Sequence, residues 1–235
     1  MLILAFETSA KAASVALMDE NKLLGESYQN TGLTHSQTLM VMAEDLLKQC
    51  GKTVQDVTAV AVAAGPGSFT GVRIGAAAAK GFAWGRELPC YGVSTLEAMA
   101  LSFGAYDGYV CPVMDARRSQ VYNALFEVNC GEYTRIREDR AISLQELGED
   151  LQKTEKPVFL VGDGSVLCYN SLSECVKGLV LPKEHRMHQR AVGVALAAAR
   201  KLNAGEEGNG AELVPNYLRL SQAERERLAR GQSLT

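Results

Sequence analysis

The sequence has few of the features that mark membrane, secreted and disulfide-bonded proteins. No apolar run approaches the roughly 18 consecutive residues that a membrane-spanning helix needs, and the short run at residues 1–6 has no basic leader before Glu7. Six cysteines are scattered without a C-x-x-C pair, so we expect reduced, apolar side chains rather than a disulfide framework. The sequence therefore predicts a cytoplasmic protein with no membrane partner.

An excess of charge of one sign is also lacking. The 24 basic residues face 27 acidic ones, which gives a net charge of −3. This balance leaves no electrostatic footprint for nucleic acid. If the protein serves a reaction on RNA, we expect another protein to hold most of the phosphates.

Familiar catalytic motifs are missing as well. The chain has no H-E-x-x-H and no G-x-S-x-G, so nothing supports a protease, and no G-K-S/T closes a P-loop. It has only three histidines. His185 and His188 fall in a predicted surface loop, and His35 begins a predicted helix, where an ordinary helical role is favoured. We expect no metal site from them.

The first part of the chain alternates apolar runs with amphipathic segments. Strands are predicted at residues 2–6, 14–18, 22–28, 57–64 and 90–93, and helices at 34–47, 70–84 and from Ser94 onward. Ser94 and Glu97 fit a capping box. The order βββαβαβα predicts a mixed five-stranded sheet with helices, forming an N-terminal lobe over residues 1–105.

A second, reduced lobe is predicted over residues 106–204. Its strands are expected at 109–114, 120–128, 133–137 and 158–161, and its helices at 143–153 and 190–202, with 164–176 as helix or loop. Its three-strand opening repeats that of the first lobe, so the two are expected to be related. Residues 205–235 are predicted as a linker and tail, with an extended stretch at 215–219.

The most distinctive stretch is GPGSFTGVRIG at residues 65–75, between a predicted strand and a predicted helix. Gly65 and Gly67 supply conformations that other residues avoid, which suits either a phosphate or close backbone packing. A duplicated βββαβα unit is similar to the actin, sugar kinase and Hsp70-like (ASKHA) fold, whose first turn grips phosphate and metal. That turn contains Glu7, Thr8 and Ser9, which predicts degenerate phosphate turns; a hairpin whose hydroxyls bond their own backbone is the alternative.

Several motifs together resemble the bacterial TsaB (YeaZ) family. Besides GPGSFTGVRIG they are E-T-S near the start, V-S-T-L-E-A after residue 92, D-A-R at 115–117 and P-N-Y-L-R at 215–219. The resemblance implies a cytosolic protein of the tRNA threonylcarbamoyladenosine pathway. Such proteins pair with the catalytic subunit TsaD and the ATPase TsaE, which modify the adenosine beside the anticodon of tRNAs that read ANN codons.

Comparison with TsaD-like chains implies that this chain is a pseudo-enzyme. Those chains carry two metal-binding histidines one helical turn apart, and Thr95 and Met99 occupy the two positions here. Lys11 stands where they have an acid. We therefore expect a non-catalytic scaffold with no metal and no cofactor, which meets tRNA only through the complex. An active ATP-dependent small-molecule kinase of the same fold is the alternative.

The resemblance also implies a helical docking surface. We expect the first two helices to bind the equivalent helices of TsaD, and to pair with a second copy of this chain in its absence. The predicted interface consists of large apolar and small residues: Leu39, Met40, Met42, Leu46, Gly71, Gly75, Ala76 and Ala79. For Asp115 to Arg118 an ion pair or partner contact is favoured over a residual nucleotide contact, and Gly162 to Gly164 is a turn or the relic of an adenosine-binding turn.

Overall fold

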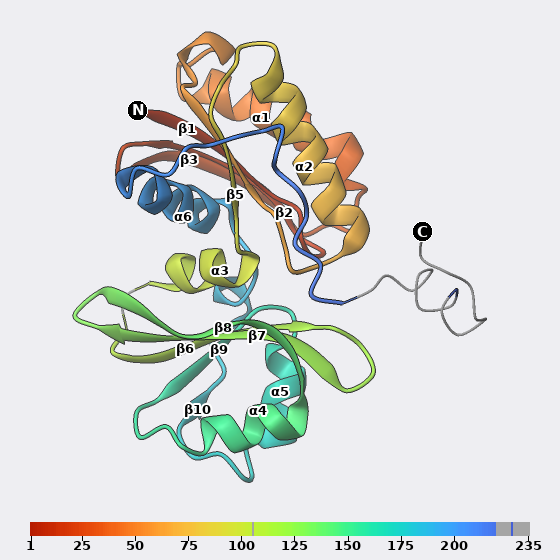
Figure 1. Ribbon diagram of the computed structural model, residues 1–235, viewed down its shortest axis with the longest axis vertical. Helices are drawn as coiled ribbons and strands as arrows, with labels where there is room; N and C mark the ends of the chain where they lie inside the picture. The colour runs from red at the N-terminus through yellow and green to blue at the C-terminus, as the bar shows by residue number, and fades with distance from the viewer. Residues whose placement is uncertain (105, 220–226, 228–235) are drawn as a thin grey trace.

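Two five-stranded sheets with the same strand order form the centre of the molecule, a computed structural model in which residues 1–104, 106–219 and 227 are described (Figure 1). The first sheet has the order β3-β2-β1-β4-β5 and the second β8-β7-β6-β9-β10. The strands are β1 (Leu2–Glu7), β2 (Ala13–Asp19), β3 (Lys22–Gln29), β4 (Ala59–Ala63), β5 (Cys90–Val93), β6 (Gly108–Asp115), β7 (Gln120–Asn129), β8 (Glu132–Ser143), β9 (Val158–Val161) and β10 (Leu179–Val180). The predicted two-lobed ASKHA-like α/β fold is confirmed.

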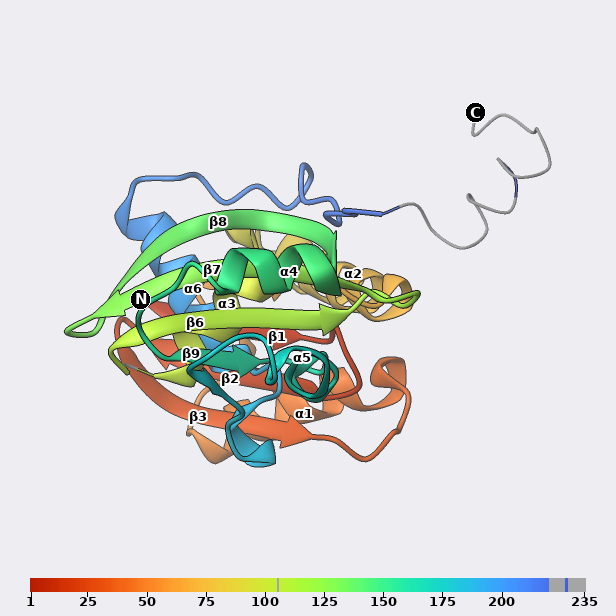
Figure 2. The same cartoon turned by 90° about the horizontal axis from the view of Figure 1, so that it is seen from below.

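Five layers alternate through the molecule. Helices α1 (His35–Gln49) and α2 (Phe69–Trp84) cover the outer face of the first sheet. Helices α4 (Leu144–Leu151) and α5 (Ser165–Leu172) cover the outer face of the second, as the view from below shows (Figure 2). Between the sheets lie α3 (Thr95–Phe103) and α6 (Ala191–Asn203), while η1 (Val54–Asp56) and η2 (Glu184–Arg186) are short 3₁₀ turns. No described helix is long and apolar enough to cross a membrane.

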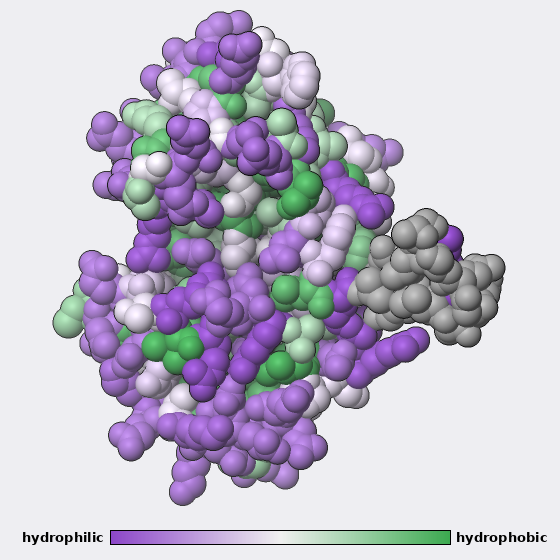
Figure 3. All heavy atoms as spheres, in the orientation of Figure 1, coloured by the Kyte–Doolittle hydropathy of each residue, from purple (hydrophilic) through white to green (hydrophobic). Residues whose placement is uncertain are grey.

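The strands follow the apolar pattern where both faces are covered. Every residue of β1 and β4 is buried, as the continuous apolar runs predict for parallel neighbours between two layers. The prediction is too short for β8, which extends to Ser143. This edge strand is only partly buried and carries arginines, so its sequence shows no apolar run. Hydrophilic residues cover most of the face seen in Figure 3, with apolar ones in small separate patches.

Helices α3 and α6 are exchanged between the lobes. Helix α3 follows the last strand of the first sheet but packs on the second sheet, whereas α6 follows the second sheet and packs on the first. The two helices touch: a Cβ atom on Gly193 would lie 1.9 Å from the carbonyl oxygen of Ala98. The predicted lobe limits at 105 and 204 divide the chain by sequence. In the structure, α6 packs on the first sheet although its residues belong to the predicted second lobe.

At the beginning of α3, Ser94 makes a local helix cap while Glu97 contacts the second lobe. Ser94 caps the helix, and its Oγ accepts a hydrogen bond from the Glu97 N–H at 3.1 Å. The return bond of the predicted capping box is absent, because the Glu97 carboxylate pairs with Arg135 of β8 at 3.2 Å. The helix start is thus local, but Glu97 serves the contact with the second lobe.

Candidate functional site

The glycine loop (residues 65–67) leaves the end of β4 and touches three other segments. The Ser68 N–H donates to the carbonyl oxygen of Ser9 at 2.7 Å, and the Thr95 N–H donates to the carbonyl oxygen of Gly65 at 2.9 Å. The Asn216 N–H donates to the carbonyl oxygen of Ala64 at 2.6 Å. The loop therefore joins the β1–β2 turn, the start of α3 and the C-terminal stretch of the chain.

Only glycine fits at either end of this loop. A Cβ atom on Gly65 would lie 2.5 Å from the carbonyl oxygen of Asn216, and Gly65 has a φ of 114°. A Cβ atom on Gly67 would lie 2.5 Å from the carbonyl oxygen of Ser9. The space a ligand would enter is thus filled by the protein's own backbone.

Three of the hydrogen-bond donors expected of a phosphate turn are engaged within the protein, whereas the buried Ser9 hydroxyl has no partner among the described residues. The Thr8 hydroxyl donates to the Gly71 carbonyl at 2.8 Å, and the Ser9 N–H donates to Glu7 Oε1 at 2.6 Å. The Ser68 N–H is held by Ser9, while the Ser68 hydroxyl caps α2 by accepting from Gly71 N. The residues of the two predicted phosphate turns are brought together, and these three donors bind within the protein, so they are not available to a phosphate.

Glu7 lies at the centre of this packing. Its side chain is fully buried, and burial raises its pKa from the ordinary value of 4.5 to about 7, opposed by the bonds from Ser9 and assisted by the negative charge of Asp163. Glu7 Oε2 has no hydrogen-bond partner. Glu7 is thus a buried carboxyl with one oxygen held by the Ser9 N–H and the other without a partner among the described residues.

Thr95 and Met99 lie inside the molecule. Thr95 is fully buried beside the glycine loop, and Met99 packs in the core that α3 shares with the second sheet. Lys11 is exposed in the β1–β2 turn. Over residues 1–104, 106–219 and 227, no group of three or more His, Cys, Asp or Glu side chains is arranged to hold a metal ion.

The strap (residues 213–219) crosses from the first lobe to the second over the glycine loop. Tyr217 stacks on Phe69 with ring centroids 4.4 Å apart, and its hydroxyl accepts from Arg73 Nε at 2.7 Å. Leu218 packs in the core between α3 and the second sheet, and Arg219 donates to the carbonyl oxygens of Ala116 and Arg117. The predicted extended stretch thus contacts both lobes, which the sequence did not suggest.

Most of the predicted docking residues are buried within the chain itself. Met40 is exposed, but the other seven lie in the core beneath α1 and α2 or against the β1–β2 turn: Leu39, Met42, Leu46, Gly71, Gly75, Ala76 and Ala79. A Cβ atom on Gly71 would lie 2.0 Å from the Thr8 carbonyl oxygen, and one on Gly75 would lie 2.4 Å from Thr8 Oγ1. The prediction that these seven face a partner is corrected: they are small or apolar because α1 and α2 pack on their own sheet.

A different set of residues faces away from the sheet on the same helices. We define the outer face as the exposed apolar and small residues of α1, α2 and the turn before α1: Leu33, Met40, Val41, Ala77, Gly81 and Trp84. Trp84 is 77% exposed, and a Cβ atom on Gly81 would meet nothing within 4 Å. The three-to-four-residue spacing of Ala77, Gly81 and Trp84 was available in the sequence, but two small-residue stripes compete on α2 and only the sheet contacts tell them apart.

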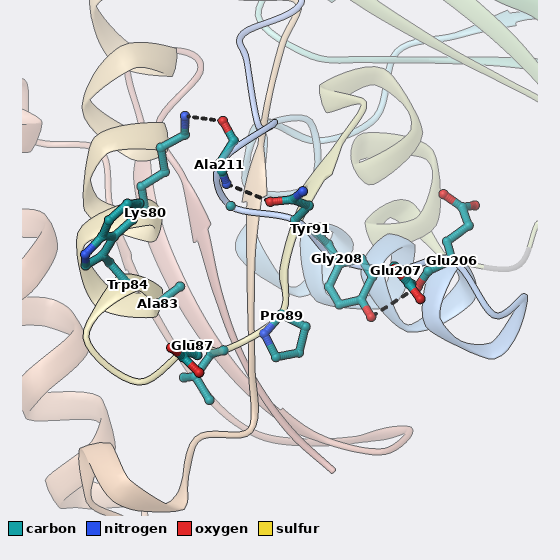
Figure 4. A pocket seen from close by; sticks show the side chains of 13 residues that line it. Lys80, Ala83, Trp84, Glu87, Pro89, Tyr91, Glu206, Glu207, Gly208 and Ala211 are labelled. Carbon is teal, nitrogen blue, oxygen red and sulfur yellow. Dashed lines mark hydrogen bonds between the residues drawn. The ribbon is translucent and has the colours of Figure 1, made fainter.

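A groove of about 690 Å³ borders the outer face at the end of α2 (Figure 4). It lies between α2 and residues 206–211, where Lys80 Nζ donates to the Ala211 carbonyl at 3.5 Å and the Tyr91 hydroxyl donates to the Glu206 carbonyl at 3.3 Å. Trp84 and Glu87 line its helical side. Trp84 therefore belongs both to this groove and to the outer face.

The remaining candidates have structural contacts. His35 begins α1, and its Nε2 lies 2.8 Å from the carbonyl oxygen of Ala10, which ties the helix to the β1–β2 turn. His185 lies in η2 and is exposed, and the His188 Nε2 lies 3.9 Å from Glu184. Asp115 Oδ1 accepts from the Arg117 N–H at 2.7 Å, and the predicted partner contact of this turn stays a prediction. Gly162 is a tight turn, because a Cβ there would lie 2.2 Å from the Val113 carbonyl oxygen.

Comparison with known proteins gives a consistent set of relatives. The sequence model of the family described as TsaD: tRNA N6-adenosine threonylcarbamoyltransferase matches residues 29–227. The chain is 34% identical over 227 residues to the tRNA threonylcarbamoyladenosine biosynthesis protein TsaB of Bacillus subtilis (strain 168), covering 95% of this chain and 96% of that one. It is 40% identical over 129 residues to TsaB of Escherichia coli (strain K12), covering 54% and 55%. The solved structure of YeaZ from Pseudomonas aeruginosa matches with a TM-score of 0.75 and 27% identity, over 92% of this chain and 99% of that one.

Proposed function

Since this chain belongs to the TsaB family, within the wider family that the TsaD model describes, we propose that it is a non-catalytic subunit for threonylcarbamoyladenosine synthesis on tRNA. Its partner in this proposal is a TsaD-like catalytic subunit, assisted by a TsaE-like ATPase. The observation that carries the proposal is the outer face of α1 and α2. Its apolar side chains are largely exposed in the isolated chain, so they are available to another protein.

The chemistry of the outer face suits a helical partner. Met40, Val41 and Trp84 supply exposed apolar side chains, and Trp is the residue type most often found at the energetic centre of protein interfaces. Ala77 and Gly81 let a second helix approach closely. In the absence of a TsaD-like subunit, the same face is proposed to pair two copies of this chain about a two-fold axis.

The packing around the glycine loop favours a scaffold over a small-molecule kinase. A kinase of this fold needs free N–H groups and hydroxyls to hold nucleotide phosphates. Here the Thr8 hydroxyl and the N–H groups of Ser9 and Ser68 are engaged inside the protein, and the backbone of Ser9 abuts Gly67. The loop therefore joins structural elements instead of presenting a nucleotide site.

Two matched valine variants test the proposed docking. Val41 and Val166 are both exposed valines on helices, the first on the outer face and the second on α5. We expect Val41→Asp to weaken association with the TsaD-like subunit at least tenfold, because a charge would be buried at the interface, and Val166→Asp to leave it unchanged. Analytical ultracentrifugation measures both; equal affinities for the two variants would contradict the docking face.

Reconstitution tests the function itself. The modification of a tRNA transcript is expected to require this chain together with the TsaD-like subunit, the TsaE-like ATPase and the enzyme that forms the threonylcarbamoyl adenylate. Omitting this chain alone should stop turnover, and an undiminished rate without it would refute the scaffold role. Calorimetry with Mg-ATP on the isolated chain addresses the kinase alternative, which micromolar affinity would support.

A further inference from the structure

We propose that the end of the molecule around the Arg117 turn binds the phosphate backbone of RNA. This inference rests on the proposed function, since it gives this chain a direct contact with the tRNA that the complex modifies. We define the basic end as the cationic residues of the β1–β2 turn, the β6–β7 turn and the strap: Lys11, Arg117, Arg118 and Arg219. These positions span more than 200 residues of sequence, and Arg219 of the strap bonds the β6–β7 turn directly.

The contacts that assemble the basic end are direct. Ala10 of the β1–β2 turn, Ala116 of the β6–β7 turn and Leu218 of the strap pack against the same core. Lys11 and Arg117 are the immediate neighbours of the first two, and Arg219 donates from one guanidinium nitrogen to the carbonyl oxygens of Ala116 and Arg117, at 2.5 and 3.3 Å. Arg219 therefore fixes the strap to the β6–β7 turn beside Arg117, and Lys11 follows a residue that packs on the same core.

The backbone of the β6–β7 turn adopts an unfavourable conformation that places two arginines at the surface. Arg117, Arg118 and Ser119 have φ values of 63°, 56° and 56°, in the left-handed region that residues with a Cβ seldom occupy three in a row. Asp115 holds the turn by accepting the Arg117 N–H. Both arginines are exposed, and neither forms an ion pair with another described residue. Glycine or asparagine would adopt this conformation at lower cost. The arginines therefore occupy a turn that is less stable than it would be with either of those residues.

Charge is distributed unevenly between the basic end, which also holds the exposed carboxylate of Asp115, and the two grooves. The groove beside α2 carries Glu87, Glu206 and Glu207 against Lys80. A second groove, of about 620 Å³, lies between the lobes and is lined by an excess of acids over Arg135 and Lys201: Glu97, Glu138, Asp139, Glu206, Glu207 and Glu212. A polyanion is repelled from these grooves and attracted to the basic end. The net charge of −3 hides this asymmetry, because it averages over both ends.

The shape of the basic end favours a nucleic-acid backbone over a single nucleotide. Small ligands bind in concave pockets that bury most of their surface, and neither groove contains Lys11, Arg117, Arg118 or Arg219. The phosphate donors of the enclosed turns are engaged inside the protein. Exposed Arg and Lys side chains on separate turns instead match a row of phosphates, which Arg contacts in a planar, bidentate manner.

Two triple variants with equal charge change test this proposal. The first is Lys11→Gln, Arg117→Gln and Arg118→Gln, which leaves Arg219 and its strap contacts in place. The control is Lys22→Gln, Lys177→Gln and Lys183→Gln, three exposed lysines outside the basic end. Fluorescence anisotropy with a labelled, unmodified tRNA transcript is measured from about 50 to 300 mM KCl, first with the isolated chain and then with the complex. Circular dichroism melting confirms that all three proteins fold.

The basic-end variant is expected to bind the tRNA at least tenfold more weakly than the control at about 0.1 M salt. The negative slope of log K against log salt is expected to become shallower by about 2. Equal affinities and slopes for the two variants would overturn the proposal. Sedimentation of the wild-type chain with the TsaD-like subunit measures their association in a separate experiment. If they fail to associate, the proposed function fails, while the measurements on the isolated chain still decide the RNA contact.

Discussion

The two faces of α2 carry similar residues for different reasons. On the inner face, Gly71 and Gly75 lie against Thr8, where an added Cβ atom would come within 2.0 and 2.4 Å of an oxygen. On the outer face, Ala77 is exposed and Gly81 has nothing within 4 Å of an added Cβ. The inner glycines are required by the fold of this chain, whereas nothing inside the chain requires the outer one.

This difference teaches that a stripe of small residues does not by itself identify a docking face. A glycine in the middle of a helix costs roughly 1 kcal/mol relative to alanine, so it persists where something gains from its absent side chain. Inside the chain that gain is the contact between α2 and the β1–β2 turn. For Gly81 no such contact exists inside the described part of the chain, where a Cβ atom would meet nothing within 4 Å.

The largest expected effect is that of Gly75→Leu on the inner face. Its Cβ atom alone would meet Thr8 Oγ1 at 2.4 Å and Val62 Cγ2 at 3.1 Å, and both atoms belong to the buried core. We expect the free energy of unfolding to fall by more than about 3 kcal/mol, as measured by urea denaturation. Failure of this variant to pair would then report unfolding. A stability within about 1 kcal/mol of wild type would show that the inner face can move away.

Glu7→Gln tests the burial of charge beside the inner face. Because the folded pKa of Glu7 is raised from 4.5 to about 7, between these values the folded chain holds a proton that the unfolded chain has lost. The stabilisation from the protonated form is complete below pH 4.5 and is lost as the pH rises through 7. For this one group the loss is at most roughly 3 kcal/mol.

Glutamine keeps the acceptor for the Ser9 N–H but does not ionise. The Glu7→Gln variant is therefore expected to lose less stability than wild type between pH 5 and pH 8. Urea denaturation at four pH values measures this, with the exposed Glu132→Gln as the control. A pH dependence identical to that of wild type would mean that Glu7 is ionised in the folded protein throughout this range.

Gly81→Leu is the outer-face counterpart of Gly75→Leu and sharpens the comparison. The monomer has open space at this position, and leucine favours a helix over glycine, so we expect unchanged or higher stability. Association with the TsaD-like subunit is expected to weaken by about 2 kcal/mol, roughly 30-fold, because the side chain keeps the partner helix away. Sedimentation velocity measures the association. Wild-type affinity would remove Gly81 from the interface.

The smallest expected effect is that of Gly81→Ala. One methyl group on an exposed helix position should raise the free energy of unfolding by roughly 0.5–1 kcal/mol through helix propensity. A thermal melt of the isolated chain measures it, with Ala77→Gly expected to shift in the opposite direction by a similar amount. A fall in stability for Gly81→Ala would show that the monomer needs this glycine after all.

Much of the fold could be predicted because its signals are local. The buried runs of β1 and β4, the polar turn between β2 and β3, and the Ser94 cap are each visible in a few neighbouring residues. Strand β8 was predicted too short, since an edge strand with a solvated face needs no apolar run. At the candidate site, the sequence indicated which turns matter, but not that Asn216 and Ser9 pack against the glycines of the loop.

The sequence by itself determined the duplicated strand order, the helix starts and the family motifs, because periodicity, capping and turn chemistry act over a few residues. Only the tertiary structure decided which stripe of α2 faces the sheet, where α3 and α6 pack, and that the strap brings Arg219 to the Arg117 turn. The physical reason is that these outcomes depend on contacts between segments far apart in the chain. Small residues, apolar residues and charges look the same in a sequence whether they meet another part of the chain or a partner.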